Sequence, residues 1–325
     1  MSFQRYFAAA LTAVCSLLGT GAVQAQADYP NKPIRLIVPF SPGGPTDVLA
    51  RVVGERMTDR LKVPVIVENR AGASSIIATE AVAKSAPDGY TFLVGSPATA
   101  SNIRLFKSLP YDTLADLSPV VQFASTPYFL IVNAKVPANS VGELLQLLKA
   151  KPDSVAYASA GAGSPGNLTA ELFNMMAGVK MLHVPYRGTG PALIDLVGDQ
   201  VQLIFAGLPS TAALIDQGKL KVLAVADAQR SEFLPEVPTV AESGVPGFEA
   251  DSWFGLFARV GTPPEVEAKI SSVIADVLAE PAIRERYKGL GAVPVVRSPK
   301  EFKEFFHSEV EKWGKVIDTA GVTPE

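Results

Sequence analysis

Cysteine and histidine are almost absent from this chain of 325 residues. The single cysteine, Cys15, lies in an apolar N-terminal stretch, so the rest of the chain forms neither a disulfide nor a thiolate nucleophile. The only histidines, His183 and His307, fall in an apolar strand pattern and an amphipathic helix pattern, too far apart in the sequence for a usual zinc set. No G-x-S-x-G motif occurs, and no pair of acids is marked out by spacing. We therefore expect no enzyme, no metal site and no cofactor.

An excess of charge of either sign is also missing. The 29 basic residues are balanced by 32 acidic residues, for a net charge of -3. Binding to nucleic acid usually needs a basic surface, or basic residues interleaved with aromatic ones on a single-strand platform. Neither pattern is present, so we expect no nucleic-acid partner.

Long hydrophobic runs are missing except near the N-terminus. Arg5 is the only charge before Asp28, and small-x-small cleavage sites end at Ala25 and Ala27. This pattern predicts a secretory signal peptide at residues 1–25, with an alternative cleavage after residue 27. Its run of about 15 apolar residues is short for a membrane span. We expect an exported, soluble, monomeric protein in the periplasm.

Strand and helix patterns alternate along the remaining chain. The order β-α-β-α-β over residues 28–128 returns over residues 129–250, and this order predicts α/β lobes with mostly parallel sheets flanked by helices. The extended segment 248–264 is interpreted as the chain crossing back to the first lobe. Helices are expected at 264–278 and 299–320. The prediction is therefore lobe 1 from residues 28–128 plus 251–325, lobe 2 from residues 129–250, and a hinge of two crossings.

A glycine-rich loop joins a strand to a helix in each lobe. The loops read "SPGGPTD" at 41–47 and "SAGAGSPGN" at 159–167. Ligands of open α/β sheets bind at the carboxyl ends of strands, where a helix start offers unpaired N–H groups and a positive dipole end. Neither loop contains Lys or Arg, which favours a carboxylate over a multiply charged phosphate.

The helix that follows each loop needs a cap. We expect Thr46 or Asp47 to cap the first helix, and Ser164 to cap the second, with Pro165 at its first position. Glycine turns before helices are also ordinary α/β connections, so one such loop alone indicates little. Two loops at matching positions in two lobes are a stronger indication of a site.

A dinucleotide site is the main alternative for the second loop. Residues 161–166 match G-x-G-x-x-G, but such a site also requires an acidic residue about 20 positions later. The next strand here ends "HVPYRG", without an acid. The carboxylate interpretation is therefore preferred.

Further polar side chains are candidates for the same cleft. The hydroxyl groups of four residues either donate to a ligand or cap helices, and both roles stay open. Arg187 either pairs with a ligand carboxylate or is solvated. The aromatic residues Phe40, Tyr128 and Trp253 either line the cleft or belong to the core or hinge. The four hydroxyl residues are Ser74, Ser75, Ser96 and Thr99.

Several segments, in order along nearly the whole chain, resemble one family. They include "YPNKPIRLIVPFSPGGPTD", "APDGYTFLVG", "YASAGAGSPGNLTAELF", "HVPYRGTGPALIDLVGDQVQLIF" and "WFGLFARVGTPP". The sequence resembles the Bug-type (Bordetella uptake gene) solute receptors of tripartite tricarboxylate transporters. The resemblance implies a two-lobed periplasmic binding protein fold of type II character, a small carboxylate ligand, and delivery to the membrane subunits of such a transporter.

The resemblance also implies that both glycine loops grip one carboxylate of the ligand. In lobe 1 the matching residues are Ser41, Gly43, Gly44, Thr46 and Asp47, beside Phe40. In lobe 2 they are Ser159, Gly161, Gly163 and Ser164.

Two departures from the family pattern bear on the ligand. Ser74, Ser75 and Ile76 stand where many members have a Gly-Gly-Asn-type run, and Ala206 stands where many have Asp. Losing that acid disfavours a ligand with an amino group, because a buried ammonium needs a partner. Added serines favour a second carboxylate. We expect a dicarboxylate without an amine, with an aromatic ring allowed. The alternatives are a ligand sensor for a signalling system and an exported α/β enzyme acting on an acid.

Overall fold

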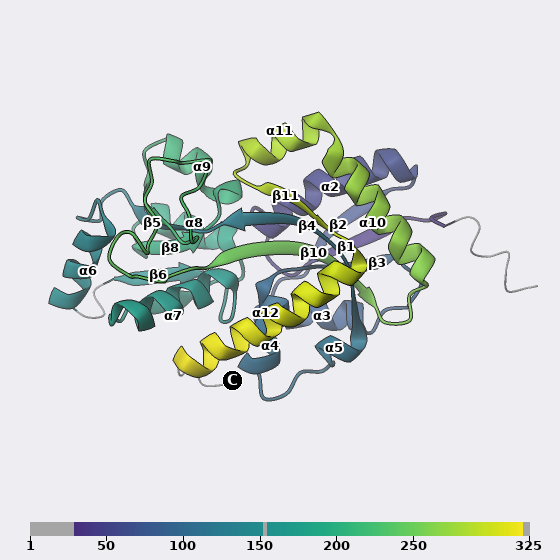
Figure 1. Cartoon of the computed structure of the whole chain (residues 1–325), viewed down its shortest axis with the longest axis horizontal. Coiled ribbons are helices and arrows are strands. Elements are labelled where there is room, and N and C mark those ends of the chain that lie inside the picture. Colours follow the sequence, from purple (N-terminus) through teal and green to yellow (C-terminus); the bar gives the residue numbers. More distant parts are fainter. Residues whose placement is uncertain (1–28, 152–154, 321–325) are drawn as a thin grey trace, which may run out of the picture.

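The structure is a computed structural model that describes residues 29–151 and 155–320. The predicted signal peptide lies outside these residues. Two lobes, each a sheet covered by helices, lie side by side along the longest axis (Figure 1). In the part of the chain that is described, no helix has the length and apolar character that a bilayer crossing demands.

Lobe 1 is built on a six-stranded sheet in the order β11-β4-β10-β3-β1-β2. β1 pairs in parallel with β2 and β3, whereas β10 is antiparallel to β3 and β4, and β11 is antiparallel to β4. Four of the five residues of β1, "IRLIV", are buried, as in a strand covered on both faces. The strands are β1 (Ile34–Val38), β2 (Val65–Asn69), β3 (Thr91–Gly95), β4 (Leu117–Pro127), β10 (Asp251–Arg259) and β11 (Val293–Arg297).

Lobe 2 is built on a five-stranded sheet in the order β7-β6-β8-β5-β9. β6 is parallel to β7 and β8, and β5 is antiparallel to β8 and β9. The strands are β5 (Phe129–Asn133), β6 (Ala156–Ser159), β7 (Leu182–Pro185), β8 (Leu203–Ala206) and β9 (Leu220–Val225).

The helices cover both faces of the two sheets (Figure 1). Lobe 1 carries α2 (Pro45–Leu61), the 3-10 turn η1 (Ala73–Ser75), α3 (Ile76–Ala83), α4 (Pro97–Leu105), α5 (Thr113–Asp116), α10 (Pro264–Ala279), α11 (Pro281–Gly289) and α12 (Pro299–Ala320). Lobe 2 carries α6 (Val141–Ala150), α7 (Pro165–Ala177), α8 (Thr189–Val197) and α9 (Leu208–Asp216).

The chain crosses between the lobes on strands that pair with each other. β4 runs into β5, and the returning chain enters β10, where Asp251 lies opposite Pro127. The Ala226 N–H donates to the Tyr128 carbonyl at 2.7 Å, and the Ala250 N–H donates to the Ala226 carbonyl at 2.6 Å. The two-lobed α/β fold is confirmed. The sheets are mixed, however, and not mostly parallel, because the crossing strands run antiparallel to their neighbours. The lobe boundaries stay a prediction.

The C-terminal helices show what local patterning can and cannot reveal. The expected helices at 264–278 and 299–320 are confirmed as α10 and α12. The expectation omitted α11 and β11. Ile283 and Tyr287 of α11 are buried in an otherwise charged segment, so the segment has too few apolar positions for a periodic signal.

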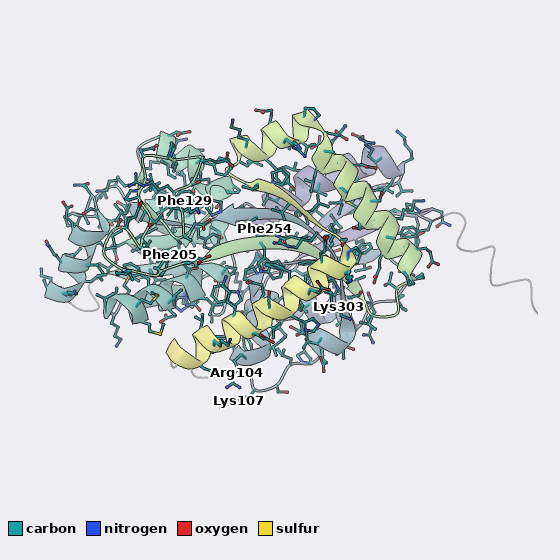
Figure 2. All side chains as sticks on the ribbon, viewed as in Figure 1. Arg104, Lys107, Phe129, Phe205, Phe254 and Lys303 are labelled. Carbon is teal, nitrogen blue, oxygen red and sulfur yellow. The ribbon has the colours of Figure 1, made fainter. Side chains whose placement is uncertain are left out.

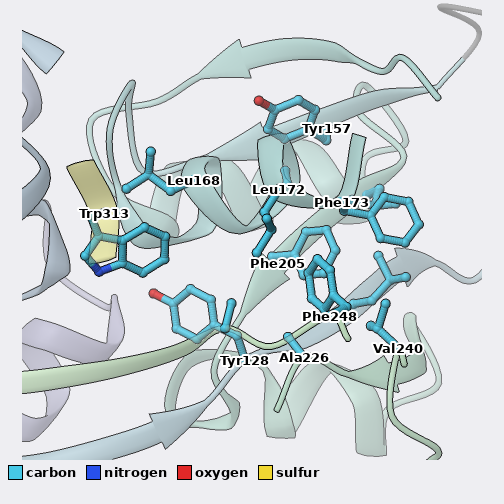
Figure 3. Packing of buried hydrophobic residues seen from close by; sticks show 14 of the residues in the cluster. Tyr128, Tyr157, Leu168, Leu172, Phe173, Phe205, Ala226, Val240, Phe248 and Trp313 are labelled. Carbon is cyan, nitrogen blue, oxygen red and sulfur yellow. The ribbon is translucent and has the colours of Figure 1, made fainter. Parts of the chain in front are cut away.

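The hydrophobic core continues from one lobe into the other. One buried cluster includes Ile37 and Leu93 of lobe 1 and Leu168 of lobe 2. Trp313 of α12 approaches Tyr128 and Leu168 in this cluster (Figure 3).

Large side chains of both sheets fill the interior. Phe129, Phe205 and Phe254 lie along the central strands (Figure 2), and each is at most 2% exposed. A packed centre of this kind supports the loops at the strand ends.

Candidate ligand-binding site

The first glycine loop leads from β1 into α2. Gly44 is the N-cap of α2 and Pro45 occupies the first turn, where its fixed φ and missing N–H cost the helix nothing. The expectation that Thr46 or Asp47 caps the helix is therefore wrong, because both already lie inside the first turn. The Asp47 side chain instead binds a residue before the helix: its Oδ2 accepts the Gly43 N–H at 3.0 Å.

Asp47 is a buried carboxylate with several donors. Its Oδ1 accepts from Arg51 Nε at 3.0 Å and from Asn69 Nδ2 at 2.9 Å. Burial raises the pKa of Asp47, but the hydrogen bonds from Arg51, Gly43 and Asn69 outweigh it, and the pKa lies below its usual value. The carboxylate therefore stays ionised, with Arg51 as its counter-charge.

The second glycine loop leads from β6 into α7 with the same geometry. Ser164 is the N-cap and Pro165 lies in the first turn, as predicted, although the Ser164 side chain makes no capping hydrogen bond. Its Oγ is buried and has no hydrogen-bond partner among the described residues. The Gly163 N–H donates to Asn167 Oδ1 at 2.8 Å.

The two loops therefore share a pattern, Gly-x-Pro-x-Asp or Asn, at residues 43–47 and 163–167. In each loop the glycine has a positive φ, +87° at Gly43 and +70° at Gly163, and donates to the side chain four residues ahead. The role of Asn167 was missed in the sequence. The repeated spacing is the signal that identifies it.

The lobes touch each other at these loops. The Ser41 N–H and Oγ both donate to the Arg187 carbonyl, at 3.0 and 2.7 Å. Ser101 Oγ of α4 donates to the Gly163 carbonyl at 3.0 Å. Each lobe thus contributes polar groups to the other at the rim of the cleft.

A small inner cavity lies between the two helix starts. Its volume is about 10 Å³, room for about one water molecule. The candidates Phe40, Gly44 and Thr46 line it from lobe 1. The full lining is Phe40, Gly44, Pro45, Thr46, Tyr128, Ala160, Pro165, Thr189 and Phe254.

A larger outer cavity of about 300 Å³ shares Phe40 and Ala160 with the inner one. The candidates Ser74, Ser75 and Gly161 line it. Of the residues that line the two cavities, Arg187 alone carries a charge. The outer lining is Pro39, Phe40, Gly72, Ala73, Ser74, Ser75, Ala160, Gly161, Ala162, Pro185, Tyr186 and Arg187.

The turn η1 places Ser74 and Ser75 at the outer cavity in a strained backbone. The three residues 73–75 have φ of +43°, +50° and +78°, although none is glycine. Asn102 of α4 holds this turn, because its Nδ2 donates to the Ser74 carbonyl at 2.7 Å and to Ser75 Oγ at 3.0 Å. Asn102 was not predicted, since it lies far from the turn in the sequence.

Other predicted residues do not line the inner or the outer cavity. Ser96 is the N-cap of α4, and its N–H donates to Thr99 Oγ1 at 3.3 Å, which favours the capping role for this pair. Ala206 packs in a hydrophobic cluster of lobe 2. Trp253 is fully buried in the core.

Ser159 lies beneath the second loop, beside one of the two histidines. Its Oγ accepts the Gly161 N–H at 3.1 Å and lies 2.7 Å from His183 Nε2. Burial lowers the pKa of His183, with the charge of Glu171 acting in the opposite direction. Ser159 therefore supports the loop from below and does not line either cavity.

A cavity of about 500 Å³, larger than the inner and outer cavities, is not at the glycine loops. It is lined by residues of α9 and α11, by residues 232–234 and by Gly291, whereas the glycine loops follow β1 and β6. Its charged lining consists of one base, Lys288, and three acids, Asp216, Glu232 and Glu285, and this excess of acid suits a carboxylate poorly. Among the described residues, no group of three or more His, Cys, Asp or Glu side chains is placed to hold a metal ion.

Residues 49–322 match the family described as "Tripartite tricarboxylate transporter family receptor". The chain belongs to this family. The protein BugT of Bordetella pertussis is 39% identical over 305 residues, which cover 93% of this chain and 94% of BugT. A Pseudomonas protein from the tcbD-tcbE intergenic region is 36% identical, over 94% of this chain and 92% of its own length.

Solved structures of similar sequence agree with the fold. Rpa4515 of R. palustris with adipate superposes with a TM-score of 0.89 at 36% identity, covering 91% of this chain and 100% of its own. MatC of Rhodopseudomonas palustris with bound malate gives 0.84 at 32% identity, covering 89% and 100%. The periplasmic binding protein BugD gives 0.88 at 35% identity, covering 91% and 100%. Members of this family are periplasmic solute-binding proteins and not enzymes.

Proposed function

We propose that this protein is a periplasmic receptor that captures an amine-free dicarboxylate between its lobes and delivers it to the membrane subunits of a tripartite transporter. The observation that carries the proposal is the charge of the two cavities. Arg187 is the only charged residue in their linings. Asp47, the acid of the first loop, already accepts hydrogen bonds from Arg51 and Asn69. An acid gains from such a site, whereas an ammonium group has no partner there.

The two cavities also suit a ligand with two carboxylates. One carboxylate contacts the N–H groups of the paired helix starts at the inner cavity, where Gly44, Thr46 and Ser164 are the proposed contacts. The second lies in the outer cavity, near Ser74 and Ser75. Because the inner cavity has room for about one water molecule, the lobes must part to admit a carboxylate and close over it again. Adipate and malate, the acids bound to the two R. palustris relatives, each have two carboxylates and no amino group.

A binding screen tests the proposal. Purified protein without residues 1–25 is titrated calorimetrically with adipate, L-malate, L-aspartate and L-glutamate. We expect adipate or malate to bind, and either acid at 100 times its dissociation constant to add about 2.7 kcal/mol to the free energy of unfolding. Tight binding of aspartate or glutamate, with none of the amine-free acids, would contradict the proposal.

Delivery and oligomeric state need separate measurements. We expect the exported protein to be a monomer by light scattering. Immobilised receptor saturated with adipate should retain the membrane subunits of the transporter from solubilised membranes more strongly than ligand-free receptor does. Retention of a signalling protein instead would favour the sensor alternative.

A further inference from the structure

A chain of hydrogen bonds leads from the second glycine loop into the body of lobe 2. The Gly163 N–H donates to Asn167 Oδ1 at 2.8 Å, and Asn167 Nδ2 donates to the Tyr157 hydroxyl at 2.7 Å. The Tyr157 hydroxyl in turn donates to Glu171 Oε1. Asn167 is 6% exposed and Tyr157 is 0% exposed, so water competes little for these groups.

The carboxylate of Glu171 determines which group donates and which accepts in each of these hydrogen bonds. An ionised carboxylate only accepts hydrogen bonds, so the Tyr157 hydroxyl points its proton at Glu171 and its lone pair at the Asn167 amide. The amide must then present its NH2 group to Tyr157 and its carbonyl oxygen to Gly163. An Asn side chain has two amide orientations, and here only one of them satisfies both neighbours.

A second branch from Tyr157 reaches the other glycine of the loop. The Tyr157 ring stacks on His183, with 4.7 Å between ring centroids and 16° between planes. His183 Nε2 lies 2.7 Å from Ser159 Oγ, which accepts the Gly161 N–H at 3.1 Å. Tyr157 therefore contacts both Asn167, which accepts from Gly163, and His183, which lies against the Ser159 side chain that accepts from Gly161.

Lobe 1 supports its loop in the same way with different residues. Asp47 takes the place of Asn167 and accepts from Arg51 and Asn69, whereas Asn167 donates to Tyr157. Neither Tyr157 nor Glu171 lines the inner or the outer cavity. Any contribution of the two residues to binding therefore acts through the shape of the loop and not through contact with a ligand.

We propose that Tyr157 and Glu171 are positioning residues, which set the affinity for a carboxylate by holding the loop at 161–164 in its binding conformation. A loop ordered before binding does not lose its conformational freedom on binding, and its N–H groups need no reorganisation. The inference rests on the proposed function, because it assumes that this loop contacts the acid.

Paired tyrosine variants test the inference. Tyr287, like Tyr157, is 0% exposed, but its hydroxyl has no hydrogen-bond partner among the described residues, so Tyr287→Phe is the matched control. We expect Tyr157→Phe, which removes both hydrogen bonds of the hydroxyl, to raise the dissociation constant of adipate roughly tenfold, and Tyr287→Phe to change it less than about twofold. Glu171→Gln keeps an acceptor for Tyr157, so its loss should be smaller than that of Tyr157→Phe.

Amide hydrogen exchange of the ligand-free proteins separates positioning from general stability. Peptides that cover residues 160–167 should exchange faster in Tyr157→Phe than in wild type, while peptides from β5 and β8 stay unchanged. If Tyr157→Phe does not fold, Glu171→Gln carries the same comparison.

The outcomes are distinct. Wild-type binding of adipate together with unchanged affinity and unchanged loop exchange in Tyr157→Phe overturns the inference. If wild type binds neither adipate nor malate, the proposed function falls, and the inference falls with it; faster loop exchange in the variant then shows a structural role only.

Discussion

Trp253 and Trp313 donate their indole N–H groups to the same oxygen, Oε2 of Glu309, at 2.7 and 2.9 Å. Trp253 lies on the crossing strand β10, and Trp313 lies on α12, so this carboxylate ties the C-terminal helix to the hinge. Glu309 is 4% exposed and has Lys312 Nζ at 3.5 Å from its other oxygen. These are the two tryptophans of the chain.

Removal of this carboxylate should destabilise the fold. Glu309→Ala leaves two buried donors without a partner, and we expect a loss of about 2–4 kcal/mol in the free energy of unfolding, measured by urea denaturation. Glu309→Gln keeps an oxygen acceptor and should lose less. Equal losses in the two variants would mean that packing, and not the indole hydrogen bonds, accounts for the effect.

A large side chain at Gly44 should prevent binding. A Cβ atom there would lie 3.5 Å from the Thr189 Cβ of the opposite lobe, so a leucine projects into the inner cavity. We expect Gly44→Leu to fold, by circular dichroism, but to lose the thermal shift with adipate. Gly142→Leu, on an exposed face of α6, is the control and should keep the shift. A full adipate shift in Gly44→Leu would place the site elsewhere.

Ser164 offers a test of direct contact. Its Oγ has no hydrogen-bond partner among the described residues, so Ser164→Ala should change the free energy of unfolding of the ligand-free protein by less than about 0.5 kcal/mol. If the hydroxyl donates to the bound acid, the dissociation constant of adipate should rise about tenfold in calorimetry. An unchanged constant would remove Ser164 from the site.

His183 should make the fold sensitive to mild acid. Burial lowers its pKa below the ordinary 6.5, so the unfolded chain takes up a proton before the folded one does. Its contribution to stability is complete above about pH 6.5 and is lost as pH falls through the lowered pKa. Urea denaturation from pH 7.5 to pH 5 should therefore show falling stability, and His183→Gln should flatten the profile. His307→Gln, at an exposed position on α12, should leave the wild-type profile. A steep profile retained in His183→Gln would assign the effect to other groups.

Sequence patterns revealed the features that depend on neighbours along the chain. Pro165 after Ser164 fixes where α7 begins, and the periodic segments of α10 and α12 specify their own faces. Features that depend on distant segments were missed. Asn102 supports the turn at 73–75 from another helix, and no local pattern indicates that pairing. The mixed character of the sheets was not predicted for the same reason: β10 pairs with β3 and β4 from a later part of the chain.

The two loops of the candidate site were predictable because glycine and proline mark a turn before a helix in any context. The direct contact between lobes, such as Ser41 with the Arg187 carbonyl, leaves no such mark, since a backbone carbonyl is present at every residue. Asn167 was visible in principle as the counterpart of Asp47, but its partner Tyr157 is recognisable only once the strand and helix are packed together.

The pairing of β4 with β10 limits how this molecule can flex. Two strands bonded side by side up to Pro127 and Asp251 form a ribbon, and a ribbon bends easily across its flat face but resists shear in its own plane. The lobes should therefore rotate about one hinge axis and return to the same relative position after each opening. In a receptor that binds and releases its ligand many times, this strand pairing would keep the two glycine loops facing each other in every cycle.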